Sequence, residues 1–327
     1  MASKRHLLVI CLLAFVTVAN AQVSAKGGTE WRDSSLIPAS RMAQHNEFLN
    51  NQYLFPAKPR SQWELGFKIG SPNIQGDVKS NFPRFGYGVH LRKALGYLVS
   101  VRAEFNHGSA SGLNWKSSSN YMYNTAWASN GYKGNVRTYS GVGAQNVQLI
   151  PATDAVYYNY KTNLNDLSGQ VLLNLSNIRF HKAEPKFALY AILGVGVTFY
   201  ETKVDALNAS GQKYNFNTIQ GNNYANRKQT LSQLKALLDG TYETKAQVVE
   251  GAKFFGMKAK VSKTIGIGGA FKLSKRVNLA FEDRLSFVND DLLDGQMWYE
   301  VPRGDAGATG DYDTHNFLSI GLNFNIF

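Results

Sequence analysis

From residue 63 to the end of the chain, apolar and polar residues alternate with a period of two in eight separate segments. Such alternation is typical of β-strands that have one apolar and one polar face. In the first segment, Trp63, Leu65, Phe67 and Ile69 share the apolar face. The apolar residues of the other seven segments run over 85–91, 97–105, 167–175, 187–199, 265–273, 277–285 and 318–326. The pattern therefore predicts an all-β protein with eight strands.

The connections between these segments alternate strictly in length. Three are short, at 93–96, 177–186 and 274–276. The other four are long, at 71–84, 107–163, 202–253 and 289–313. A transmembrane barrel has this arrangement because its successive connections lie on opposite sides of the membrane, short in the periplasm and long outside the cell. We therefore expect residues 63–327 to form an eight-stranded antiparallel up-and-down transmembrane β-barrel with long extracellular loops.

The surrounding lipid determines which face of such strands points inward. Apolar residues face the bilayer, and polar residues line the lumen, which eight strands make narrow. Six charged residues then share the lumen: Glu64, Lys68, Arg102, Glu104, Glu282 and Arg284. Since both signs of charge are present, we expect these side chains to pair and to close the lumen. Asp283 departs from the pattern, because the alternation aims it outward, either near the outer interface or after a β-bulge.

The first 21 residues have the three parts of a cleavable secretory signal. Lys4 and Arg5 come first, an apolar run over 7–18 follows, and Ala19-Asn20-Ala21 provides the cleavage site. An apolar run of about twelve residues is too short to cross a bilayer as a helix. We therefore expect residues 1–21 to be a signal peptide, removed together with Cys11, the only cysteine. Without cysteine the mature chain has no disulfide and no thiolate metal site, and we expect no metal and no cofactor.

Two segments have the spacing of helices instead of strands. Residues 22–62 are expected to form an N-terminal periplasmic segment, with a short helix over 38–50. The third long loop contains Leu231, Leu234, Leu237 and Leu238, followed by Gly240 as a helix stop. We expect this second helix to pack on its own loop, and binding of a partner is the alternative.

The charge of the chain is strongly positive, at +12, and removal of Lys4 and Arg5 leaves +10. Nucleic acid is one anionic partner to consider, but no basic helix and no RNA-binding signature accompanies the charge. For an exported protein, outer-membrane lipid and lipopolysaccharide are the expected counter-charge. The sequence thus predicts a lipid partner and no nucleic acid.

Histidines near the strand ends raise the alternative of a barrel enzyme that acts on lipid or peptide at its rim. His107 comes close to Ser109 and Ser111, and His315 follows Asp311 and Asp313. The alternation points His107 outward and His315 inward, so the two groups do not converge on one nucleophile and base. We therefore expect no enzyme.

Acidic residues gather in the fourth long loop: Asp290, Asp291, Asp294, Asp305, Asp311 and Asp313. Carboxylates bind calcium, but this spacing does not follow an EF-hand, so we expect a solvated acidic loop. Outward aromatic residues such as Trp63, Tyr87 and Tyr97 are typical of an interfacial girdle. The aromatic stretch 114–127 is a candidate for contact with a surface partner.

The last predicted strand looks like the C-terminal signal by which the barrel-assembly machinery reads outer-membrane barrels. A polar residue, a glycine two positions later, alternating apolar residues and a terminal aromatic make up this signal: Ser319, Gly321, Phe324, Ile326 and Phe327. Its position at the end of an eighth strand gives the match its weight.

Five stretches resemble the N-terminal barrel domain of the OmpA family: FPAKP at 55–59, WELG at 63–66, RKALGY at 92–97, EDR at 282–284 and DDLLDG at 290–295. The resemblance covers the mature chain and implies an outer-membrane barrel with a closed, charged interior and a role in envelope integrity or surface interaction. A small, low-conductance porin is the alternative. Family members commonly add a peptidoglycan-binding domain after the eighth strand, where this sequence stops, which puts tethering to the cell wall in doubt. A surface or periplasmic protein partner is compatible with this role.

Overall fold

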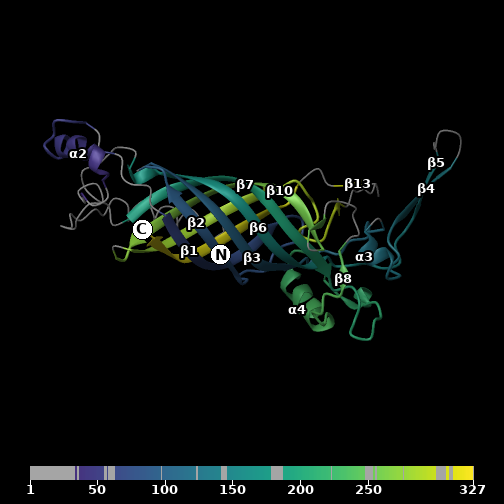
Figure 1. Cartoon of the computed structure of the whole chain (residues 1–327). Helices are drawn as coiled ribbons and strands as arrows, with labels where there is room; N and C mark the ends of the chain where they lie inside the picture. The colour runs from purple at the N-terminus through teal and green to yellow at the C-terminus, as the bar shows by residue number, and fades with distance from the viewer. Residues whose placement is uncertain are drawn as a thin grey trace.

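The computed structural model describes residues 34, 37–54, 57, 63–96, 98–122, 124–140, 146–177, 187–221, 223–246, 253–254, 256–274, 276–299, 307–308 and 312–326 (Figure 1). Several predictions fall on other residues and stay predictions: the signal peptide at 1–21 with Cys11, and the roles of Tyr97, Asp305, Asp311 and Phe327. Most of the stretch 55–62 also lies outside the described residues.

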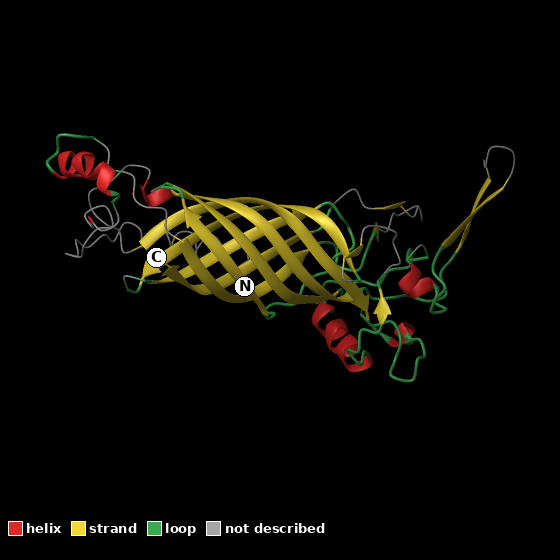
Figure 2. Ribbon diagram, in the orientation of Figure 1, coloured by secondary structure: helices red, strands yellow, loops and turns green. Residues whose placement is uncertain are grey.

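Eight long antiparallel strands form a closed barrel (Figure 2). They are β1 (Trp63–Gln75), β2 (Gly86–Ala94), β3 (Val99–Leu113), β6 (Asn159–Asn174), β7 (Phe187–Val204), β10 (Met257–Lys272), β11 (Val277–Val288) and β14 (Thr314–Ile326). Each strand pairs with the next of the eight, and β1 pairs with β14 to close the barrel. The predicted eight-stranded up-and-down barrel is confirmed.

The short and long connections emerge at opposite ends of the barrel, here called the turn end and the loop end. The short helix α2 (Met42–Leu49) follows the 3-10 turn η2 (Ala39–Arg41) and lies beyond the turn end, where the chain also ends (Figure 1). The predicted helix over 38–50 is thus confirmed. None of the helices in the described part of the chain has the length and apolar character needed to cross a membrane.

The strands extend further toward the loop end than the sequence pattern predicts. β1 continues to Gln75 and β3 to Leu113, although loops were expected from residues 71 and 107 onward. β6 likewise begins at Asn159, before the expected boundary at residue 163. Toward the loop end, the outward positions that follow the apolar residues of these strands carry Ser, Asn and Lys residues. The hydrophobic alternation therefore stops at the end of this apolar band, while backbone pairing continues. Strand boundaries there cannot be read from hydrophobicity alone.

Apolar side chains cover the outside of the barrel, and polar side chains fill its inside. Ile69 and Val195 point outward and are 57% and 66% exposed, whereas charged residues on the opposite face are buried. Asp283 faces outward in the middle of β11, half-buried, and accepts a hydrogen bond from the Asn316 side chain. The register of β11 with both neighbours is continuous around it, so the suggested β-bulge is wrong.

Three of the long connections fold together over the loop end into a compact unit, here called the loop dome (residues 114–122, 124–135, 151–158, 205–221, 223–246 and 289–297). It contains the short elements α3 (Thr125–Ala128), η4 (Phe216–Thr218), α4 (Arg227–Leu237) and β8 (Thr244–Lys245). Strands β4 (Val136–Ser140) and β5 (Asn146–Ile150) form a hairpin that projects from it (Figure 1). Four minor elements complete the description: η3 (Leu175–Asn177), β9 (Lys253–Phe254), β12 (Trp298–Tyr299) and β13 (Gly307–Ala308).

The largest apolar core of the described residues lies in the dome and at the strand ends beneath it, not in the barrel. Trp127 sits at its centre, with its ring centroid 5.4 Å from that of Tyr132 and 5.9 Å from that of Tyr158. Tyr121 and Trp127 are fully buried, so the expected surface contact of stretch 114–127 is wrong for these two side chains. α4 is the predicted second helix and inserts Leu234 into the same core, so its apolar face is occupied by its own protein.

Candidate functional site

The six predicted lumen charges all face the interior and are at most 5% exposed: Glu64, Lys68, Arg102, Glu104, Glu282 and Arg284. They come from three strands, two residues each from β1, β3 and β11. Alternation along each strand places both members of a pair on the same face. Barrel closure then brings the three strands around one narrow lumen.

Four of these side chains form a closed ring of alternating charge, here called the lumen ring. Lys68 Nζ lies 2.7 Å from Glu104 Oε2 and 3.0 Å from Glu282 Oε2. Arg102 joins the same two carboxylates, at 3.1 Å from Glu104 and 2.5 Å from Glu282. Every charge in the ring thus has two partners of opposite sign, which offsets the cost of removing it from water.

The ion pairs continue toward both ends of the barrel. On the loop side, Arg284 bridges Glu104 Oε1 at 2.6 Å and Asp166 Oδ2 at 3.1 Å. On the turn side, Arg92 lies 2.7 Å from Glu64 Oε2. Eight charged residues make up this lumen network: Glu64, Lys68, Arg92, Arg102, Glu104, Asp166, Glu282 and Arg284. Four are cationic and four anionic, so the network is balanced.

Four members of the site were not singled out from the sequence, the first being Arg92 at the turn-side end of the network. Asp166 lies two residues before Ser168 on the polar face of its strand, and extending the alternation past Leu167 finds it. Tyr190 donates to Glu282 Oε1 at 2.7 Å, but its strand is apolar almost throughout, so only its even spacing from Gly194 indicated an inward position. Gln170 accepts from Arg102 Nε at 2.8 Å. Tyr190 and Gln170 thus contact the ring directly, whereas Asp166 contacts Arg284 beside it.

Glycines on the inner face leave room for the charged side chains. Gly268 lies directly opposite Tyr190, and a Cβ there would come within 2.5 Å of the Tyr190 ring. Gly321 lies opposite Lys68, where a Cβ would come within 2.8 Å of Lys68 Cβ. Packing of the lumen therefore requires the small residue at position 321 independently of any assembly signal.

The other residues of the predicted assembly signal lie along β14 at its junction with β1. Ser319 points inward, while Phe324 and Ile326 point outward and pair with Leu65 and Trp63. Their recognition by the assembly machinery stays a prediction.

The described acidic residues of the fourth loop are buried in the loop dome or at its junction with the barrel, so the predicted solvated acidic loop is wrong for them: Asp290, Asp291, Asp294 and Asp313. Asp290 lies 2.7 Å from Lys258 Nζ and accepts a hydrogen bond from the Tyr200 hydroxyl. Asp294 accepts from the backbone N–H of Val78 at 2.8 Å. The sequence could not reveal this burial, because it depends on contacts with the first loop and with β7 and β10.

Asp294 and Asp313 lie against each other at the junction of barrel and dome. A Cβ on Gly76 would overlap Asp313 Oδ1 and come within 2.5 Å of Asp294 Oδ2, so the two oxygens are close neighbours. Asp313 Oδ2 also accepts from Leu293 N at 2.7 Å. Burial raises the pKa of both carboxyls, and the charge of Asp294 raises the pKa of Asp313 further. The pair therefore favours holding a proton.

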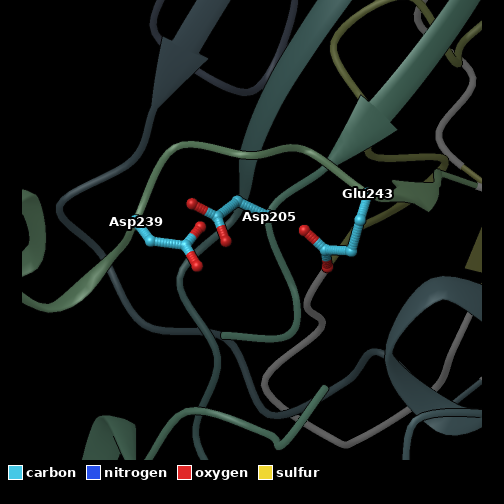
Figure 3. Close-up of side chains that lie close together, drawn as sticks. All are labelled: Asp205, Asp239 and Glu243. Carbon is cyan, nitrogen blue, oxygen red and sulfur yellow. The ribbon is translucent and has the colours of Figure 1, made fainter. Parts of the chain in front are cut away.

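A second acidic group lies in the dome, formed by Asp205, Asp239 and Glu243, which each bring one carboxylate oxygen within 4.8 Å of the other two (Figure 3). Asp205 accepts from the Tyr214 hydroxyl at 2.8 Å and from Gly240 N at 2.7 Å. Glu243 accepts from backbone N–H groups of residues 206 and 207. Burial raises the pKa of Asp205. The three carboxylates thus organise the turn that follows α4.

The two rim histidines lie on opposite sides of the barrel wall, as the alternation predicts. His107 faces outward, where its Nδ1 lies 2.7 Å from Asn165 Oδ1 and its ring contacts that of Tyr87. His315 is buried in the lumen, with Nε2 3.4 Å from Thr198 Oγ1. The structure does not bring them together into one site.

No protein-family model matches the sequence, and no curated protein matches it. Among solved structures, the chain is similar to Neisserial surface protein A, at 7% identity and a TM-score of 0.37, over 81% of this chain and 97% of that chain. A major outer membrane protein from Thermus thermophilus has 10% identity and a TM-score of 0.36, over 82% and 100%. The N-terminal β-barrel domain of Pseudomonas aeruginosa OprF has 7% identity and a TM-score of 0.29, over the same shares. These identities are too low to assign the chain to a family.

Proposed function

We propose that this protein is an outer-membrane barrel with a closed lumen, which serves the cell envelope as a structural or surface-interaction protein. Its mature chain spans the membrane once exported, inserted by the barrel-assembly machinery. It is neither an open porin nor an enzyme. The balanced lumen network is the observation that carries this proposal.

The outer face of the barrel supports a membrane location. Val195 and Val261 are each 66% exposed, and neighbouring outward residues on all eight strands are mostly apolar. A large exposed surface that is mostly apolar is unfavourable in water and favourable in lipid, where closure of the barrel satisfies every strand edge. The basic charge and the N-terminal signal-like segment agree with export to a membrane of anionic lipids.

The interior supports a closed lumen. Eight strands leave little space between facing side chains, and the lumen ring holds Lys68, Arg102, Glu104 and Glu282 across it. An ion that passes must break contacts in which each charge already has two partners. The loop dome adds a second closure, because its apolar core continues into the strand ends through Leu164 and Tyr200.

Planar-bilayer conductance of the refolded mature protein tests the proposal. The wild-type barrel should conduct little, because the ring fills the lumen. Glu282→Ala should raise leak current, because it removes one carboxylate from both Lys68 and Arg102 and admits water. Glu201→Ala is the matched control, since Glu201 lies on the outer face and pairs with Lys245; it should not change conductance. Large, steady wild-type conductance would overturn the proposal in favour of a small porin.

A further inference from the structure

Cationic side chains form a row across the outer wall of the barrel near the loop end. Lys161 of β6 lies directly opposite Lys203 of β7, which lies directly opposite Lys245 of β8. Ser111 of β3 continues the row on the other side of Lys161, and the Arg84 guanidinium donates a hydrogen bond to its hydroxyl. We call Arg84, Lys161, Lys203 and Lys245 the cationic row. Its three lysines lie on β6, β7 and β8, and Arg84 reaches the next strand, β3, through Ser111.

This arrangement is unfavourable unless an anion joins it. Like charges directly opposite each other on neighbouring strands repel. Lys245 has a partner, Glu201, at 3.3 Å, but within the described residues neither Lys161 nor Lys203 forms an ion pair. Lys161 and Lys245 are exposed, and Lys203 is half-buried between them. The row therefore offers several amines and one guanidinium to an external group.

The position of the row indicates what that group is. On β7 the last outward apolar residue is Phe199, four residues before Lys203. With about 3.3 Å per residue and a strand tilt of about 40°, the row lies roughly 10 Å beyond the apolar band. That is the depth of lipid head groups on the loop side of the membrane. A free anion can bind at any height on the protein surface, whereas the phosphate of a lipid lies at the depth of the head groups.

We propose that the cationic row binds the phosphate groups of a phosphorylated lipid in the outer leaflet of the membrane. The lysines act as point charges, and Arg84 supplies planar, paired donors to the phosphate oxygens. Binding relieves the repulsion between Lys161 and Lys203 and anchors the barrel at a fixed depth. The inference rests on the proposed membrane location and adds the class of lipid and the residues that hold it.

Native mass spectrometry of the detergent-solubilised, full mature protein tests this binding. Lipid A with both phosphates is the probe, and dephosphorylated lipid A and inorganic phosphate are the comparison ligands. Wild-type protein should retain lipid A, and Lys161→Gln/Lys203→Gln should retain it at least about tenfold less, since two charges at the site are lost. Lys116→Gln/Lys133→Gln removes the same charge from exposed sites in the dome and should bind like wild type.

Thermal unfolding in phosphatidylcholine vesicles gives a second readout and shows that the variant folds. Without phosphorylated lipid, Lys161→Gln/Lys203→Gln should be at least as stable as wild type, because the opposed amines no longer repel. Adding lipid A should raise the midpoint of the wild type and not of this variant. Equal lipid A retention by both proteins, equal retention of the dephosphorylated lipid by wild type, or displacement by millimolar inorganic phosphate would each overturn the proposal. Failure of wild type to insert into vesicles would instead contradict the proposed function.

Discussion

Lys68 and Glu104 lie on strands that are not paired with each other, β1 and β3, with β2 between them, yet their charged atoms meet at 2.7 Å inside the lumen. The pair therefore ties the barrel wall across its interior, in addition to the backbone ladder that runs around it. Burying two charges costs several kcal/mol each in desolvation, which an ion pair offsets only when all its partners are present. The lumen ring meets this condition through Arg102 and Glu282.

Removing one member of the ring should therefore cost more than an ordinary surface ion pair. Glu104→Gln takes the shared carboxylate from Lys68, Arg102 and Arg284, leaving their buried charges undercompensated. We expect the free energy of unfolding to fall by about 3–5 kcal/mol, measured by urea denaturation in lipid vesicles. Glu201→Gln, which breaks an exposed pair with Lys245, should cost less than about 1 kcal/mol. Similar losses for the two variants would contradict this account of the ring.

Packing in the lumen makes a second prediction at Gly268. An alanine there would press its Cβ into the ring of Tyr190, so Gly268→Ala should destabilise the barrel by about 1–3 kcal/mol. Gly169→Ala is the matched control, because that glycine has open space where the Cβ would lie. In a Tyr190→Ala background the cost at position 268 should largely disappear, which a double-mutant cycle measures. If Gly268→Ala still destabilised the Tyr190→Ala variant, the overlap with the Tyr190 ring would not be the cause of the loss.

The barrel was predictable because lipid and lumen impose opposite demands on alternating residues. Glu64 and Lys68 are recognisable as lumen residues from sequence alone, since both occupy even-numbered positions between the apolar residues at the odd-numbered positions of β1. Asp166 and Tyr190 were missed because one lies beyond the apolar band and the other in a strand that is apolar on both faces.

The loop dome was not predictable, because its contacts join residues far apart in the chain. Trp127 packs on Tyr158 and Phe216, and Asp294 accepts from Val78 N, 216 residues away. Periodicity describes one segment at a time and says nothing of such contacts. An aromatic stretch has the same sequence pattern whether its loop is exposed or is buried against other loops. For that reason Trp127 looked like a surface residue.

The orientation of the barrel can be tested with single cysteines, because the only natural cysteine, Cys11, lies in the predicted signal peptide. Thr138→Cys places a thiol at an exposed site on the projecting β4–β5 hairpin, and Ser274→Cys places one at the short β10–β11 turn. We expect a membrane-impermeant maleimide to label position 138 on intact cells and position 274 only after lysis. Wild-type protein without a thiol provides the blank. The reverse labelling pattern would invert the barrel in the membrane.

The Asp294–Asp313 pair makes the junction between barrel and dome sensitive to pH. Both carboxyls have pKa values raised above the ordinary 3.8, because they are buried; the charge of Asp294 raises the pKa of Asp313 further, and the charge of Asp77 raises that of Asp294. The folded dome therefore binds a proton more tightly than the unfolded chain does. At pH values at which this proton stays bound, it adds to the free energy of unfolding. That contribution is complete below about pH 4 and is lost as the pH rises through the raised values, which for Asp294 is about 7.

We therefore expect the dome to loosen between pH 5 and pH 9. A variant that keeps Trp127 as its only tryptophan reports this, because Trp127 is fully buried in the dome core. Less urea should expose it at pH 9 than at pH 5. Adding Asp313→Asn should flatten the dependence, because it removes the carboxyl of the pair whose pKa is raised further, to about 9. Asp154→Asn, on the dome surface, should leave the slope in place, because it does not touch the pair. A dependence that Asp313→Asn leaves unchanged would assign the titration to other groups.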